Sequence, residues 1–185
     1  MNHPESLLVP GLMLSDYILT VAGARLRTAY AKHFKTPSYE LNPLWQVAVA
    51  QRRWFNWKHL ALTALVGALV IWLSELSRTP DPTVAYVLSL VFGVQGMING
   101  RHLGNLATFA YLRRHPEQLS GEVIMSHEFT LWLSLFQTAA VLVPVALLLI
   151  PTPTPRTLGA FTGVVGIALV HLIWLWRHKS RQTSL

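Results

Sequence analysis

Two stripes of polar side chains lie inside long apolar stretches of this sequence, and they are the residues best placed to do chemistry. Spacings of three, four and seven residues put the members of each stripe on one face of a helix. The stripes are Gln95, Asn99 and His102 in the first stretch, and His127, Thr130, Ser134 and Gln137 in the second. Polar groups in an apolar environment are costly unless they are paired or line a wet cavity. The stripes therefore indicate either hydrogen bonds that hold two helices together or a polar path for an ion or a small solute.

The sharper part of this set is a group of titratable side chains near one end of the two stretches. It consists of His102, His127 and Glu128, with Asn105 beside them. Two imidazoles and a carboxylate can bind a divalent metal ion, so these three are the candidate metal ligands. The alternative is a proton relay or a pH sensor built on the histidines. Against the metal site, adjacent residues of a helix point about 100° apart, and the sequence contains no HExxH spacing.

The composition indicates a protein whose main solvent is lipid. Hydrophobic residues make up 52% of the 185 residues and charged residues only 12%, against about 25% charged in a soluble domain. There is no cysteine, which excludes disulfides, thiolate metal sites and cysteine nucleophiles. The sequence also contains no P-loop, dinucleotide fingerprint, nucleophile elbow or zincin motif, so it assigns no cofactor.

Three stretches meet the length requirement of roughly 20 apolar residues for a helix that crosses a bilayer. They are Leu60–Leu76, Phe129–Ile150 and Thr157–Trp176. A fourth candidate span, Thr83–Leu112, is apolar for its first two turns and then contains Gln95, Asn99, Arg101 and His102. The sequence thus predicts an all-α, polytopic integral membrane bundle, with a four-helix transmembrane domain at 60–185 and an N-terminal region at 1–59. A helix over Thr83–Leu112 would be longer than the bilayer is thick, so a helical hairpin with its tip around 105–126 is expected to protrude from the membrane.

The N-terminal region leaves two alternatives open. Leu7–Ala24 is apolar except for Ser15, Asp16 and Thr20. A carboxylate in its middle and Pro10–Gly11 at its start favour an amphipathic or re-entrant helix that lies in the membrane interface. The other alternative is a fifth membrane span.

The basic residues predict the orientation of the bundle. They cluster on one side of a four-span arrangement: Arg52, Arg53 and Lys58 before the first span, Arg113 and Arg114 after the second, and Arg177, Lys179 and Arg181 after the fourth. By the positive-inside rule this side is cytoplasmic, and so is the C-terminus, in the plasma or inner membrane of a prokaryote. We expect the first of these groups to contact anionic lipid headgroups. The net charge of +7 is thus a topology signal, and no nucleic-acid partner is expected.

A direct pairing of the second and third spans would bring the two polar stripes together. If these antiparallel helices are levelled at Thr83 and Ile150, Asn99 comes opposite Ser134. His102 then lies one residue from the level of Thr130. This register predicts one shared polar stripe.

The stretch "YELNPLW" at 39–45 raises a question of its own. Asn42 is a favoured N-cap residue and Pro43 suits the first helical position, so a helix over 43–59 is expected along the membrane surface. Glu40 lies on the same side of the membrane as His102 and His127. We therefore expect Glu40, and also Glu128, to help close a site there.

Three classes of function fit these observations. The first is an oligomeric channel or transporter for an ion or small solute, because four short spans enclose little interior in one protomer. The second is a non-catalytic membrane subunit, in which the polar stripes are structural. The third is a membrane-embedded enzyme at the cytoplasmic interface. Gly159 and Gly163, four residues apart, suit close helix packing within the chain or in a homo-oligomer.

Overall fold

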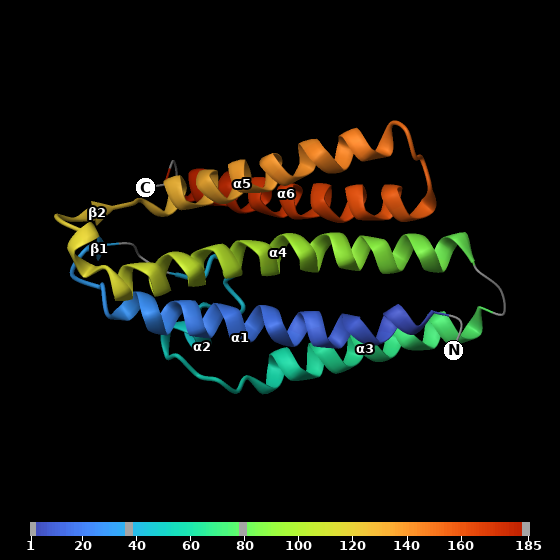
Figure 1. The fold of residues 1–185 in the computed structure, drawn as a ribbon, viewed down its shortest axis with the longest axis horizontal. Coiled ribbons are helices and arrows are strands. Elements are labelled where there is room, and N and C mark those ends of the chain that lie inside the picture. Colours follow the sequence, from blue (N-terminus) through green and yellow to red (C-terminus); the bar gives the residue numbers. More distant parts are fainter. Residues whose placement is uncertain (1–2, 36–38, 78–80, 183–185) are drawn as a thin grey trace.

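Five long helices run back and forth along the length of the molecule (Figure 1). The computed structural model describes residues 3–35, 39–77 and 81–182. Within them the long helices are α1 (Leu8–Thr28, after a short 3-10 helix η1 at Pro4–Leu7), α3 (Trp57–Leu76), α4 (Pro82–Arg114), α5 (His127–Leu149) and α6 (Pro155–Gln182). All five are long and apolar enough to cross a membrane. The chain is therefore an all-α, multi-pass membrane protein, as its composition predicts.

Helix α4 lies at the centre of the bundle, with α6 on one side and α1 on the other. Helix α3 packs on the outside of α1, and α5 packs on the outside of α6. At 33 residues, α4 is the longest of these helices, and at 1.5 Å per residue it reaches about 50 Å. It exceeds the hydrocarbon core of about 30 Å, so one end extends beyond the spanning region.

The N-terminal segment packs as a fifth span. Pro4–Thr28 is a continuous helical stretch of 25 residues that meets the spanning criteria, and it packs against α4 and α3. Its Val9 and Met13 share an apolar core with Val70, Val84 and Leu88. Of the two placements that the sequence leaves open, the structure thus favours the fifth span over the interfacial helix.

Glycines on α6 explain why α4 packs so closely against it. A side-chain carbon at Gly159 or Gly163 would collide with the backbone oxygens of Tyr86 and Leu90 on α4. The reverse holds at Gly93, where it would collide with the backbone of Ala160. The small-residue stripe of α6 is therefore a packing surface within the chain.

One end of the bundle, which we call the basic end, holds the C-terminal turns of α1, α4 and α6, each with at least two basic residues in its last turn. Short elements cover it. They are α2 (Gln46–Ala50), the 3-10 helix η2 (Pro116–Gln118), and strands β1 (Phe34–Lys35) and β2 (Val123–Ile124), which pair in parallel. The connection from α1 to α3 and the connection from α4 to α5 thus meet at this end.

The helix expected over 43–59 is wrong in extent. The Asn42 side chain accepts the Leu44 N–H at 3.0 Å and its backbone oxygen accepts the Gln46 N–H at 3.1 Å, so Asn42 caps the turn that leads into α2. The helix ends early, at Ala50, and Arg52 follows with a positive φ of 54°. A second N-cap, Asn56, accepts the N–H groups of Lys58 and His59 and begins α3.

Candidate functional site

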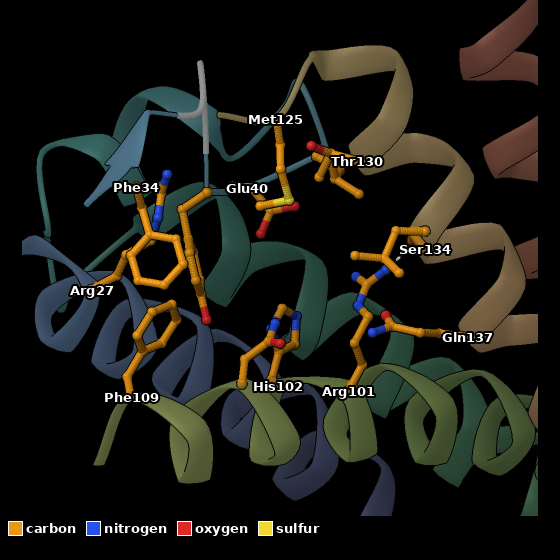
Figure 2. A pocket seen from close by; sticks show the side chains of 14 residues that line it. Arg27, Phe34, Glu40, Arg101, His102, Phe109, Met125, Thr130, Ser134 and Gln137 are labelled. Carbon is orange, nitrogen blue, oxygen red and sulfur yellow. Dashed lines mark hydrogen bonds between the residues drawn. The ribbon is translucent and has the colours of Figure 1, made fainter. Parts of the chain in front are cut away.

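Two internal cavities meet at α4, on the half of the bundle nearer the basic end. The small cavity has a volume of about 140 Å³ and lies between α1, α4, α5 and the connection after α1 (Figure 2). The large cavity has a volume of about 390 Å³ and lies between α1, α3, α4 and α6. Glu40, Arg101 and His102 line both. We call the two cavities together the chamber.

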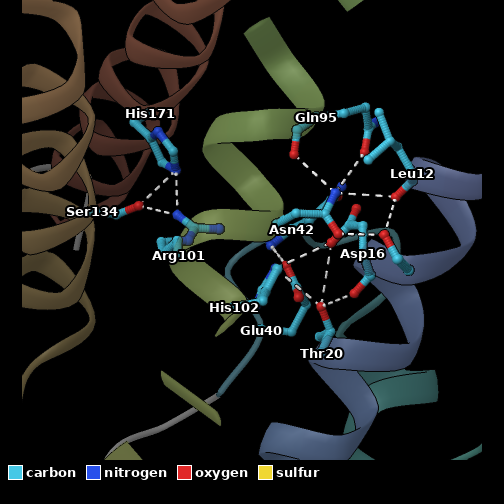
Figure 3. Close-up of polar contacts among 12 residues, drawn as sticks. Leu12, Asp16, Thr20, Glu40, Asn42, Gln95, Arg101, His102, Ser134 and His171 are labelled. Carbon is cyan, nitrogen blue, oxygen red and sulfur yellow. Dashed lines mark hydrogen bonds and ion pairs between the residues drawn. The ribbon is translucent and has the colours of Figure 1, made fainter. Parts of the chain in front are cut away.

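An imidazole joins α4 to α1 within the chamber. His102 Nε2 lies 3.2 Å from Asp16 Oδ1 and 3.0 Å from Thr20 Oγ1 (Figure 3). An ionised carboxylate only accepts hydrogen bonds, so Nε2 of His102 carries the hydrogen that faces Asp16. The Thr20 hydroxyl donates to the backbone oxygen of Asp16 at 2.8 Å. His102 is thereby held in one orientation, with its ring buried.

The amides of the first polar stripe form a second link between α4 and α1. Asn99 Nδ2 donates to the backbone oxygens of Leu12 at 3.1 Å and Gln95 at 2.8 Å. The Ser15 hydroxyl donates to Asn99 Oδ1 at 2.5 Å. Gln95 and Asn99 are both buried; Asn99 bonds across to α1, and Gln95 bonds to Asn99 within α4. This part of the stripe holds helices together.

A guanidinium joins α4 to α5 and α6. Arg101 Nη1 contacts Ser134 Oγ, and it lies 3.4 Å from His171 Nε2. Ser134 Oγ and His171 Nε2 are 3.0 Å apart. Because a guanidinium can only donate, His171 Nε2 is the acceptor and His171 is neutral. Arg101 thus carries its charge among uncharged partners at this contact.

The connection after α1 folds back and forms one wall of the chamber. Tyr39 lies against Gly23 of α1, where any side-chain carbon would collide with the phenol ring. Leu41 packs into an apolar cluster with Leu131 and Leu175. Between them, Glu40 is only 7% exposed, and its Oε1 accepts the Asn42 N–H at 2.7 Å.

Burial controls the protonation of this connection. Burial raises the pKa of the Glu40 carboxyl above its ordinary value, although the Asn42 N–H and the charges of His102 and Arg101 act in the opposite direction. Burial likewise raises the pKa of Tyr39 to about 12, so its phenol is neutral at physiological pH. Of Tyr39 and Glu40, it is therefore Glu40 that can change its charge near physiological pH.

The residues that the sequence singles out fall into three sets. Asn105, Thr130, Ser134 and Gln137 line the small cavity together with Glu40 and His102. Asn99 faces α1, and Gln95 bonds to Asn99. His127 and Glu128 lie elsewhere, at the α5–α6 contact: the His127 ring centroid is 5.1 Å from that of His178, and Glu128 is 3.2 Å from Lys179 Nζ.

The expected metal site is therefore not assembled. His102 is held by Asp16 and Thr20, while His127 and Glu128 pair with α6. Across residues 3–35, 39–77 and 81–182, no three histidine or acidic side chains are grouped as a metal site would need.

The expected register between α4 and α5 is also wrong. Asn99 meets Ser15 of α1, not Ser134, which bonds to His171 of α6. The reason is that α6 is the principal neighbour of α4, since its glycines permit the closest approach. The two polar stripes thus serve different contacts.

Sequence reasoning missed several ionisable residues of the chamber. They are Asp16, Arg27, Arg101 and His171. The sequence does contain a signal for such residues, because an ionisable residue inside an apolar span marks a functional site by default. From the sequence alone, the Asp16 carboxylate instead argues against a span.

Comparisons with known protein families, with curated proteins and with solved structures find no match to this chain. Function is therefore argued from the chamber.

Proposed function

We propose that the protein is a carrier for a small polar solute, and that the chamber is its binding site. The observation that supports this most is that Glu40, Arg101 and His102 line both cavities between the helices. Burying an ionised group costs several kcal/mol unless it is paired. The amide of Asn99 already links α4 to α1 without any charge, through the Leu12 backbone oxygen and Ser15. Charges that face a cavity are better explained by a ligand than by packing.

The apolar half of the bundle favours a carrier over an open channel. Away from the basic end, Val9, Met13, Val70, Val84 and Leu88 form a buried core. Such a core blocks a polar route through a single chain. Release of the solute on that side would require the helices to move, as in alternating access.

The orientation of the carrier follows from its charges. We place the basic end in the cytoplasm, by the positive-inside rule. Arg52, Arg53 and Lys58 are exposed there, where they can contact anionic headgroups. The chamber would then load and unload from the cytoplasmic side in the present conformation.

A catalytic role is less well supported. Ser134 and His171 resemble a nucleophile and its base, at 3.0 Å. However, Arg101 also donates to the same His171 nitrogen, and His171 Nδ1 is without a hydrogen-bond partner in the described part of the chain. A working dyad needs a group that orients the base.

The proposal is tested by ligand-induced stabilisation of the purified protein. A solute at 100 times its Kd stabilises the folded state by about 2.7 kcal/mol. A panel of anionic, cationic, zwitterionic and neutral solutes is screened by thermal unfolding in detergent. At least one should stabilise the wild type but not Arg101→Gln. The matched control is Arg156→Gln, because Arg156 is exposed and pairs with Glu5 at the opposite end. If no solute stabilises the wild type, or if Arg101→Gln responds equally, the proposal is wrong.

A further inference from the structure

The small cavity carries more positive than negative charge. Arg27 of α1 and Arg101 of α4 both line it, and Glu40 is the single carboxylate among its lining residues within the described ranges. Arginine stays protonated in proteins. Arg27, Arg101 and Glu40 together therefore contribute a net charge of +1 when Glu40 is ionised and +2 when Glu40 is neutral, while His102, which also lines the cavity, is paired with Asp16 outside it.

Neither guanidinium is neutralised by the contacts that the structure shows. The Arg27 guanidinium lies 5.9 Å from the ring centroid of Tyr39, which stabilises a cation without removing its charge. Arg101 donates to Ser134 and His171, which are both uncharged. Two guanidiniums that line one cavity favour an anion there, because a guanidinium fork matches a carboxylate or phosphate.

The remaining lining fits a small oxyanion. The amides of Asn105 and Gln137, which can donate hydrogen bonds, line the same cavity. The hydroxyls of Thr130 and Ser134 also line it, and they bond to the Ser126 backbone oxygen and to His171. The volume of about 140 Å³ is close to that of an engineered protein cavity of about 150 Å³ that holds benzene. Acetate and inorganic phosphate fit such a space, whereas a nucleotide does not.

Glu40 is the one lining group that opposes an anion. Its burial raises the pKa of its carboxyl, so Glu40 holds a proton more tightly than an exposed glutamate does. A second negative charge in the cavity would raise this pKa further. The titratable and charged groups that surround Glu40 in the chamber are Asp16, Tyr17 and Arg27 of α1, Tyr39, His59 of α3, Arg101 and His102 of α4, and His171 of α6. Of these, Asp16 has His102 as a partner at 3.2 Å.

We propose that the small cavity binds a small oxyanion, a carboxylate or a phosphate, between Arg27 and Arg101, and that Glu40 takes up one proton from solvent when the anion enters. A monovalent anion and a proton enter together without net charge, which suits a site between membrane helices. This inference rests on the proposed carrier function and names its solute class.

Calorimetric titration of the purified full-length protein tests both parts. Acetate and inorganic phosphate are the probes, each titrated in two buffers that differ in ionisation enthalpy, which counts the protons taken up. Above the pKa of Glu40, one proton is expected per acetate bound, and affinity should fall about tenfold per pH unit. Glu40→Gln keeps an oxygen for the Asn42 N–H. It should bind acetate with no proton uptake and little dependence on pH.

Arginine variants test the location of the anion. Arg27→Gln and Arg101→Gln should each weaken acetate binding at least about tenfold, since hydrogen bonds to charged groups contribute about 1.5–3 kcal/mol. Arg27→Lys and Arg101→Lys keep the charge and guard against loss of folding, which size-exclusion chromatography monitors. The control is Arg25→Gln, because Arg25 lies on α1 but contacts Trp54 and the Arg52 backbone. Its affinity should match the wild type.

The outcomes separate this inference from the function on which it rests. If tetramethylammonium or a neutral solute binds through Arg101 while acetate and phosphate do not, the inference is overturned and the carrier function stands. If no solute of any class binds, both fail.

If acetate binds without proton uptake and Glu40→Gln keeps the wild-type pH profile, the role of Glu40 is overturned. If nanodiscs containing phosphatidylglycerol show lipid binding that depends on both arginines, and free acetate and phosphate do not compete, the anion is a lipid headgroup and the solute assignment is overturned.

Discussion

Asp16 of α1 and His102 of α4 face each other at 3.2 Å, carboxylate oxygen to imidazole nitrogen. The His102 side chain is 6% exposed and that of Asp16 is 22% exposed. Both belong to helices that are apolar enough to cross a membrane. This contact links the two helices, and removal of either side chain leaves the other without its partner across the helix contact.

Removal of Asp16 should therefore destabilise the bundle. Asp16→Ala leaves the buried His102 N–H without its carboxylate, which should lower the free energy of unfolding by about 1–3 kcal/mol. Unfolding in mild detergent measures this cost. The control is Glu128→Ala, whose half-exposed pair with Lys179 should contribute at most about 1 kcal/mol. In a double-mutant cycle with His102→Ala, purely additive costs would show that the contact is not energetically coupled.

The Asn99 amide should matter for stability rather than for ligand binding. Asn99→Leu removes the hydrogen bonds to the Leu12 backbone and to Ser15, at a cost of about 1–3 kcal/mol for each buried group left unsatisfied. Gln137→Leu, which changes a residue of the small cavity, should cost less stability. Thermal unfolding of both variants tests the difference. Equal stability of Asn99→Leu and wild type would contradict the structural role.

The α4–α6 contact should not tolerate a side chain at Gly163. Gly163→Ala places a carbon against the Leu90 backbone oxygen, and overpacking of this kind costs about 1–3 kcal/mol. Gly96→Ala on α4 meets open space and should be neutral, or stabilising by up to about 1 kcal/mol through helix propensity. If the two variants have the same melting temperature, the close crossing of α4 and α6 is wrong.

Glu40 should make stability depend on pH in a defined direction. Its pKa is raised above the ordinary value of 4.5, so the folded protein binds this proton more tightly than the unfolded chain does. The resulting stabilisation is present below pH 4.5 and is lost as the pH rises through the raised pKa. Glu40→Gln, which cannot ionise, should gain stability relative to wild type over the same rise. Melting curves of both proteins from pH 4.5 upward measure this, and a constant difference between them would exclude it.

Sequence alone predicted the membrane bundle because length and hydropathy suffice for each helix. It did not predict the placement of α1, since Asp16 is an argument against a span until His102, far away in the sequence, is seen to pair with it. From the sequence we also paired α4 with α5, because these two helices follow each other in the chain. In the structure α4 packs closely on α6 instead, because the α6 glycines allow the two backbones to approach. Glu40 was expected near His102, but its position depends on how Tyr39 packs on Gly23, which no local pattern reveals.

The proposed carrier requires a hydrated chamber that opens at the basic end and is closed by the apolar core beyond it. The chain contains no cysteine, so single cysteines report accessibility without background. Ser134→Cys lines the small cavity, and Leu88→Cys lies in the apolar core. Both are exposed to a membrane-impermeant thiol reagent in vesicles of each orientation. Ser134→Cys should be labelled from the side of the basic end alone, and Leu88→Cys from neither side. Labelling of Ser134→Cys from neither side would mean that the chamber is a packed core, and labelling from both sides would mean an open channel.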